Sequence, residues 1–182
     1  MQTLDVIYLI STELENLFGI TILFRRTEST VSSQTYYLCA SNIIFIMYTF
    51  ETSIRVRYGE TDQMGYVYYG NYPLYYEVGR TEMLRSLELS YRAMEEEDIL
   101  LPVHSLNIKY IEPAKYDDLL TLRVILKELP TAKIHFYYEV YNEQKRLLNT
   151  GETVLVFVDA HTRRPRRAPE VLLTELERYF PG

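Results

Sequence analysis

One strand pattern, one long helical pattern and four further strand patterns follow one another between residues 52 and 158, and this order limits the possible folds most. Alternate residues of the first segment are apolar, as in a half-buried strand, at Ile54, Val56 and Tyr58. Apolar residues then follow a helical spacing at Tyr72, Tyr76, Gly79, Met83 and Leu87. Strand-like segments follow at about 101–111, 118–128, 133–142 and 147–158. We expect an α+β fold with one long helix against a five-stranded antiparallel sheet.

The connections between the later segments are short and rich in turn-forming residues. They lie at residues 112–114, 129–131 and 142–144, and short connections predict antiparallel neighbours in the sheet. A short helix is expected at 91–98, and a C-terminal helix at about 169–180. Apolar residues occupy both faces of 119–126 and of 154–158, and one helix cannot cover both faces of a sheet. We therefore expect a homodimer or homotetramer, in which a second subunit covers the other face.

Residues 1–46 differ from the rest of the chain. They contain no Lys, their periodicity is weak, and a clean strand pattern begins just after Met47. Either residues 1–46 are a weakly structured extension, or the true protein begins at Met47. In both cases residues 47–182 form the expected domain. The apolar run 43–47 is too short to span a membrane, and no secretory signal is evident. The single Cys39 cannot form an intramolecular disulfide, which favours a cytoplasmic location.

The composition excludes two general classes of protein. With 47% hydrophobic and 24% charged residues, the chain can bury enough apolar surface to fold, so general disorder is not expected. The formal net charge of -6 disfavours a nucleic acid as partner, because phosphate backbones attract an excess of Lys and Arg.

Several common chemistries lack the residues that they need. No Ser lies in a Gly-x-Ser-x-Gly elbow, and Gly65 and Gly70 are followed by Asn71 and Tyr72 instead of the Lys and Ser or Thr of a phosphate loop. The three histidines have no metal-ligand spacing and are interpreted as solvated or core residues: His104, His135 and His161. We expect no metal and no cofactor.

The segment 58–72 retains a possible chemistry, because Asp62 lies in a Gly-containing loop just before the start of the long helix. The first N–H groups of a helix have no partner within it and can stabilise a developing oxyanion. A carboxylate beside such groups suits acyl transfer, and thioesters in particular, because a thiol leaves with little help from a general acid. The alternative is that Asp62 only caps a turn or the helix, since Asp is favoured at both places.

The same segment carries a family resemblance. It reads Arg57-Tyr58-x-Glu60-Thr61-Asp62-x-x-Gly65-x-Val67-Tyr68-Tyr69-x-Asn71-Tyr72, and further matches are Tyr76-Glu77, Arg80-Thr81-Glu82-Met83-Leu84-Arg85, Ile108-x-Tyr110-x-x-Pro113-Ala114-x-x-Asp117-Asp118 and Arg164-Pro165. Over residues 50–180 the chain resembles the 4-hydroxybenzoyl-CoA thioesterase and YbgC-like branch of the hotdog-fold acyl-CoA thioesterases. The resemblance implies a long helix wrapped by an antiparallel sheet, a homodimer or homotetramer, and a substrate tunnel between subunits.

The resemblance also implies roles for individual residues in the hydrolysis of an acyl-CoA to a free acid and CoA. Asp62 matches the family's catalytic aspartate, as nucleophile or as base for water, and Tyr69 matches the position whose backbone N–H polarises the thioester carbonyl. Glu60 stands where many relatives carry a second aspartate. Glu77 is interpreted as a helix ion-pair partner, although other hotdog thioesterases place a catalytic carboxylate on this helix. The expected substrate-binding residues around the loop are Gly65, Val67, Tyr68 and Tyr72.

Four arginines close to the C-terminal helix are a further candidate binding site: Arg163, Arg164, Arg166 and Arg167. Arg163 and Arg164 are expected to bind the phosphates of CoA, since guanidinium groups engage phosphates bidentately. A solvated basic turn is the alternative. An acyl carrier protein thioester is the rival substrate, and a hotdog module that binds acyl groups without turnover is the rival function. The preference for short, long or aromatic acyl groups is left open.

Overall fold

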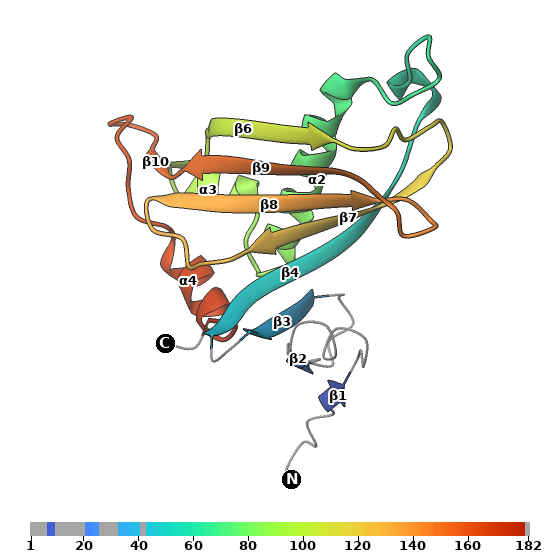
Figure 1. The fold of residues 1–182 in the computed structure, drawn as a ribbon. Coiled ribbons are helices and arrows are strands. Elements are labelled where there is room, and N and C mark those ends of the chain that lie inside the picture. Colours follow the sequence, from blue (N-terminus) through green and yellow to red (C-terminus); the bar gives the residue numbers. More distant parts are fainter. Residues whose placement is uncertain (1–6, 10–20, 26–32, 41–42, 181–182) are drawn as a thin grey trace.

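The computed structural model describes the backbone of residues 7–9, 21–25, 33–40 and 43–180, and the side chains of residues 47–180. Residues 1–46, which we expected to be a weakly structured extension, lie largely outside the described residues. From residue 52 onward a strand, a long helix, a short helix, a series of strands and a C-terminal helix follow one another in the order that the sequence predicts (Figure 1). The strands are β1 (Ile7–Leu9), β2 (Thr21–Arg25), β3 (Ser33–Ala40), β4 (Ile43–Arg55), β5 (Ile99–Leu100), β6 (Val103–Tyr110), β7 (Leu119–Leu126), β8 (Lys133–Tyr141), β9 (Leu147–Val156) and β10 (Val158–Asp159). The helices are α2 (Tyr72–Ser86), α3 (Tyr91–Glu96) and α4 (Glu170–Glu177), with the short 3₁₀ turns η1 (Tyr58–Glu60) and η2 (Tyr69–Asn71).

The central sheet is antiparallel, in the order β4-β7-β8-β9-β6, and β3, β2 and β1 continue it beyond β4. The short links β7–β8 and β8–β9 join neighbours, as expected. The link between β6 and β7 does not, so that prediction was wrong: β6 pairs with β9, three strands away from β7. Residues 111–118 can cross this distance of roughly 15 Å, because adjacent strands lie only about 4.8 Å apart.

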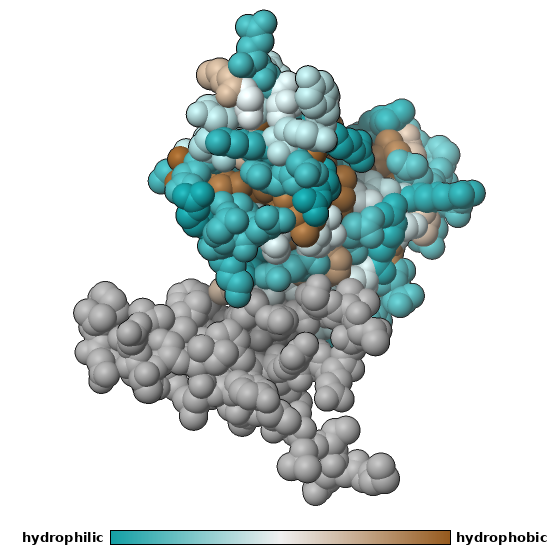
Figure 2. Space-filling model, turned by 90° about the vertical axis from the view of Figure 1, so that its right-hand side faces the viewer, coloured by the Kyte–Doolittle hydropathy of each residue, from teal (hydrophilic) through white to brown (hydrophobic). Residues whose placement is uncertain are grey.

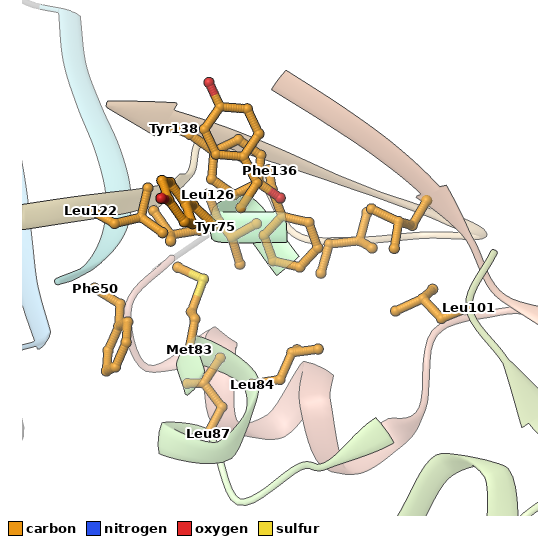
Figure 3. Close-up of a cluster of buried hydrophobic side chains, with 14 of the residues drawn as sticks. Phe50, Tyr75, Met83, Leu84, Leu87, Leu101, Leu122, Leu126, Phe136 and Tyr138 are labelled. Carbon is orange, nitrogen blue, oxygen red and sulfur yellow. The ribbon is translucent and has the colours of Figure 1, made fainter. Parts of the chain in front are cut away.

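Helix α2 crosses one face of the sheet and supplies the centre of the core. Its predicted stripe is confirmed, since Tyr72, Tyr76, Gly79 and Met83 are buried against the strands. At Gly79 a Cβ atom would lie 2.4 Å from Leu122 Cδ2, so only glycine allows the helix to approach β7 this closely. Figure 3 shows the cluster that results, in which residues of α2 face residues of the strands and two residues from the connecting segments, Leu87 and Leu101, join them. The labelled members are Phe50, Tyr75, Met83, Leu84, Leu87, Leu101, Leu122, Leu126, Phe136 and Tyr138.

The first strand ends earlier than its apolar alternation predicts. Val56 is buried and still exchanges backbone hydrogen bonds with residues 117 and 118, but Tyr58 belongs to η1 and is 80% exposed. The expected inward position of Tyr58 was therefore wrong. Its ring instead lies edge-on to Tyr116, with ring centroids 5.4 Å apart. The turn at η1 directs the chain into the loop that precedes α2.

The other face of the sheet is a mixture of apolar and charged residues. Arg123 on β7 donates to Glu51 on β4 over 2.8 Å and to Glu139 on β8 over 3.1 Å. Ile125, two residues along the same strand, is buried. An apolar second face, from which a covering subunit was expected, is thus interrupted by this ion-pair network. This face of the sheet therefore does not by itself indicate a second subunit.

The short α3 and the C-terminal α4 lie where the sequence predicts them. Pro169 precedes the first residue of α4, and Leu172 and Leu176 bury one side of the helix. Just beyond α4, the centroid of the Tyr179 ring lies 4.5 Å from that of Tyr48 on β4, so the C-terminal segment packs against this strand. Among the helices of the described residues, none is long and apolar enough to cross a membrane.

Candidate active site

The loop between η1 and α2 folds back on itself like a small hairpin. The backbone N–H of Asp62 donates to the carbonyl of Tyr66 over 2.9 Å, and the N–H of Tyr68 donates to the carbonyl of Glu60 over 2.9 Å. The tip is a turn in which the N–H of Gly65 donates to the carbonyl of Asp62. Gly65 has a φ of +74°, a conformation that favours glycine. This turn brings the acidic part of the loop back toward the start of α2.

The Asp62 side chain takes part in the turn. Its Oδ1 accepts a hydrogen bond of 2.8 Å from the backbone N–H of Met64, which is the capping arrangement considered as the alternative for this residue. A carboxylate has two oxygens and about four acceptor sites, so one such bond leaves capacity for a reaction. Asp62 is partly exposed. A turn role and a catalytic role are therefore compatible at this carboxylate.

The other side of the loop is anchored in the core. Val67 is buried, and its N–H donates to the carbonyl of Ala114 over 2.8 Å. An isolated β-bridge joins Tyr66 to Lys115 next to this bond. These contacts attach the loop to the segment between β6 and β7. Val67, expected to bind substrate, is thus placed as an anchor whose side chain faces the core.

The backbone N–H of Tyr69 lies at the start of a helical segment. Tyr69 is the first residue of η2, which leads directly into α2, where Pro73 occupies the first turn. Pro lacks an N–H and is tolerated there because the first N–H groups of a helix have no partner within it. The hydroxyl of Tyr110, at the end of β6, donates to the carbonyl of Tyr69 over 3.1 Å. The peptide that begins the helical segment is therefore held from the edge strand.

Tyrosine rings surround the start of α2. Ring centroids are 4.5 Å apart for Tyr68 and Tyr69, 6.5 Å for Tyr69 and Tyr110, 5.6 Å for Tyr110 and Tyr72, and 5.8 Å for Tyr72 and Tyr75. Burial raises the pKa of the Tyr72 hydroxyl, whereas Tyr68 and Tyr69 are exposed. Figure 2 faces the side of the molecule on which the Asp62 loop lies in Figure 1, and small hydrophobic patches are visible there among hydrophilic side chains. The site offers aromatic surface that runs from solvent toward the core.

Six of the predicted site residues lie in this one loop and in the first turn of α2: Asp62, Gly65, Val67, Tyr68, Tyr69 and Tyr72. Arg163 and Arg164 do not join them within one copy of the chain. Their exposed loop follows the end of β9, where the N–H of Asp159 donates to the carbonyl of Arg164. The Asp62 loop lies near the beginning of β9, so the strand separates the two sites by roughly 30 Å at about 3.3 Å per residue. Figure 1 shows the two loops at opposite ends of the sheet.

Two residues beside the loop were given no role by the sequence reasoning. Tyr110 is part of the motif that carries the resemblance, and only the pairing of β6 with β9 brings it to α2. In that pairing Tyr110 lies opposite Asn149, a fully buried residue whose Oδ1 accepts from the Tyr76 hydroxyl over 2.7 Å. Asn149 stands directly before the mixed stretch Thr-Gly-Glu-Thr at 150–153, so no local pattern indicates that its side chain is buried.

Glu77 forms an ion pair, as the sequence predicts. Its Oε2 lies 3.2 Å from a guanidinium nitrogen of Arg80, one turn along α2. Arg80 is buried and also donates through Nε to the hydroxyl of Tyr91 over 3.0 Å. A buried guanidinium needs such partners to offset its desolvation. Glu77 therefore has a structural task, which confirms its interpretation as an ion-pair partner.

Within the described part of the chain, no three His, Cys, Asp or Glu side chains are grouped so that they could hold a metal ion. His135 Nε2 lies 3.4 Å from Glu152, and His161 Nε2 lies 2.9 Å from Asp98, at separate places.

Comparison with known proteins agrees with this architecture. The family model of the Thioesterase-like superfamily matches residues 56–176, which is more than half of the chain. This chain belongs to the Thioesterase-like superfamily. Within it, the acyl-CoA thioester hydrolase YbgC of Escherichia coli is 32% identical over 128 residues, which cover 70% of this chain and 96% of the relative.

Solved structures place this superfamily member among hotdog folds. A DHNA-CoA thioesterase from Staphylococcus aureus has a TM-score of 0.63 and 34% identity, covering 73% of this chain and 84% of its own. A mutant 4-hydroxybenzoyl-CoA thioesterase, solved with 4-hydroxybenzoyl-CoA, has a TM-score of 0.62 and covers 70% of this chain and 97% of its own. Because this second structure is only 21% identical in sequence, the similarity shows a shared fold and nothing more. The resemblance to the YbgC-like branch and its hotdog fold is confirmed.

Proposed function

We propose that this chain is an acyl-CoA thioesterase that uses Asp62 and the backbone N–H of Tyr69. The observation that supports this proposal most is that one folded loop holds a carboxylate beside the start of a helical segment. Membership of the Thioesterase-like superfamily and the names of the relatives agree with thioester hydrolysis. The single cysteine favours the cytoplasm as the setting.

The proposed reaction needs three events around the thioester carbonyl. The N–H of Tyr69 donates to the carbonyl oxygen and stabilises the negative charge that develops on it. The carboxylate of Asp62 attacks the carbonyl carbon, or it removes a proton from the water that attacks. The C–S bond of the tetrahedral intermediate then breaks and CoA leaves as a thiolate. On the first route this leaves an anhydride with Asp62, which water hydrolyses to the free acid and the Asp62 carboxylate. Both routes require Asp62 to be ionised.

The proposed assembly is a homodimer or homotetramer in which β6 pairs with β6 of a second copy. Among the described strands, β6 is the last of its sheet, and its inward face carries the exposed Val103, Leu106 and Tyr110. An unpaired edge with apolar side chains is a surface that a second chain readily covers. Antiparallel pairing of two β6 strands would bring the Asp62 loop of one copy toward the arginine loop of the other. Arg163 and Arg164 could then bind the CoA phosphates across the interface, despite their distance from Asp62 within one copy.

Release of CoA from acyl-CoA substrates, measured with a thiol-reactive dye, tests the proposal. Asp62→Asn keeps the shape of the side chain but removes the base and nucleophile, and turnover should fall by roughly 10²-fold to 10⁴-fold. Asp118→Asn is the matched control, because Asp118 Oδ2 also accepts a backbone N–H, that of Lys115, over 2.8 Å. We expect this control to keep turnover close to that of the wild type. Equal losses in the two variants would reduce Asp62 to a turn residue and would contradict the proposal.

The substrate arm of the assay compares short, long and aromatic acyl-CoAs with an acyl carrier protein thioester. Hydrolysis of the acyl-CoAs at higher kcat/KM than the carrier protein thioester is the expected result. Preference for the carrier protein thioester would reassign the substrate. Binding of an acyl-CoA without any turnover by the folded wild type would instead identify a binding module.

A further inference from the structure

Glu60 connects three parts of the candidate active site through its side chain and its main chain. Its Oε2 accepts two hydrogen bonds of 2.8 Å, from the backbone N–H of Arg57 and from the hydroxyl of Tyr75 on α2. Its main-chain carbonyl accepts from the N–H of Tyr68 over 2.9 Å and from Nδ2 of Asn71 over 2.7 Å. One residue thus receives four hydrogen bonds, from the end of the first strand segment, from the loop and from the long helix.

The two main-chain bonds decide where Tyr69 lies. Tyr68 and Asn71 stand on either side of the first two residues of η2, so the Glu60 carbonyl holds both ends of the turn that presents the Tyr69 N–H. Asp62 is only two residues beyond Glu60 in the same loop. A displacement of the Glu60 backbone would therefore change the position of the N–H donor relative to the carboxylate. Such small displacements lower rates strongly, because catalysis depends on the alignment of the reacting groups.

Tyr75 fixes Glu60 to the core. Tyr75 is 4% exposed and belongs to the buried cluster in Figure 3, while the Glu60 side chain is only 21% exposed. Burial, and then the hydrogen bond to Glu60, raise the pKa of the Tyr75 hydroxyl above its usual value. The Tyr75 hydroxyl therefore stays protonated at neutral pH and can donate to Glu60 Oε2. Because Tyr75 is buried, this hydrogen bond attaches the loop to the core.

We propose that Glu60 is a positioning residue for thioester hydrolysis, held by the buried hydroxyl of Tyr75. It touches no reacting atom and acts through the loop backbone, which it holds so that the Tyr69 N–H and the Asp62 carboxylate face the same carbonyl group. This inference rests on the proposed function. It adds a residue whose effect is on kcat, since the alignment matters in the transition state more than in substrate binding.

Tyr75→Phe is the decisive variant, because it removes one hydroxyl and keeps the buried ring. We expect kcat for an acyl-CoA to fall roughly 10-fold to 10²-fold, with KM little changed. Tyr76→Phe is the matched control: the residue is next on the same helix, is buried, and donates its hydroxyl to Asn149 on β9 instead of to the loop. Both variants should lower the thermal midpoint, since each loses a buried hydrogen bond. Only Tyr75→Phe should lower kcat.

Glu60 variants give a second, independent measurement. Glu60→Ala should lose kcat as Tyr75→Phe does, and Glu60→Gln, which keeps an acceptor oxygen at the same length, should recover most of it. The double variant Glu60→Ala with Tyr75→Phe should lose little more than either single variant, because both remove the same connection. The proposal is overturned if Tyr75→Phe keeps the wild-type kcat, loses no more kcat than Tyr76→Phe, or adds its loss fully to that of Glu60→Ala. A wild type without turnover, or an active Asp62→Asn variant, would instead refute the proposed function.

Discussion

The ring of Tyr76 on α2 lies directly against the backbone of Gly151 on β9. A Cβ atom at Gly151 would lie 2.4 Å from Tyr76 Cε2 and 2.5 Å from its hydroxyl oxygen. Tyr76 is also stacked on Tyr138, the residue opposite Gly151 on β8, with ring centroids 4.2 Å apart and planes only 3° from parallel. Because Gly151 has no side chain, the large ring of Tyr76 fits between α2 and β9 at this position.

Gly151→Ala should destabilise the protein by about 1–3 kcal/mol, the usual effect of extra volume in a packed core. The Tyr76 ring cannot move aside easily, because Tyr138 confines it. Gly59→Ala is the matched control, since no heavy atom of the described residues lies within 4 Å of the Cβ position there. Denaturant unfolding measures both variants. Equal free energies of unfolding for wild type and Gly151→Ala would show that the helix shifts at no cost.

A chain that begins at Met47 should keep the thermal midpoint and the activity of the full chain. Residues 1–46 show only weak periodicity, and a clean strand pattern begins just after Met47, so we expect residues 1–46 to contribute little to the core. Thermal unfolding and CoA release compare the two chains. A midpoint lower by several degrees, or loss of soluble protein, would show that the N-terminal strands stabilise the sheet, since about 1 kcal/mol shifts a domain of this size by a few degrees.

Leu106→Glu should weaken assembly, because it places a charge on the exposed apolar face of the edge strand β6. Light scattering of the wild type at micromolar concentration should give a dimer or tetramer, and the variant should dissociate at a higher concentration. Val171→Glu, an exposed apolar residue on α4, serves as the control and should not change the mass. An active monomeric wild type under assay conditions would contradict the proposed assembly.

Replacement of Arg163 and Arg164 by Ala should raise KM for an acyl-CoA and leave kcat nearly unchanged. Binding to a remote phosphate is shared by the ground state and the transition state, so its loss affects binding alone. Added salt should weaken binding of the wild type more than that of the variant. Arg92→Ala removes another exposed guanidinium, which pairs with Glu96 on α3, and should change neither quantity. An unaltered KM and salt response would leave the arginines as a solvated turn.

Unfolding should become easier as the pH rises from about 10 toward about 12. Burial raises the pKa of Tyr138 to about 12 and also raises the pKa of Tyr75 and Tyr76, while tyrosines of the unfolded chain ionise near 10. Between these values the unfolded chain binds fewer protons than the folded one, so the free energy of unfolding falls with pH. Thermal midpoints across this range measure the loss, and Tyr138→Phe should reduce it. A flat profile would contradict the burial of these hydroxyls.

The sequence by itself determined the features that depend on neighbours along the chain. The spacing of Tyr72, Tyr76 and Met83 places one apolar face on α2, because helical periodicity acts within a few residues. The same holds for the loop around Asp62, where Gly65 supplies the positive φ of the turn. Both the long helix and the carboxylate before it could be predicted in this way.

The tertiary structure decided what depends on strands far apart in the sequence. Short links predict neighbours, yet β6 pairs with β9, and that pairing brings Tyr110 to the carbonyl of Tyr69. The two loops at the ends of β9 place Arg163 far from Asp62. Likewise, the bond between Glu60 and Tyr75 exists only because α2 packs beside the loop. Strand order and helix docking follow from the burial of many side chains together, which no local period encodes.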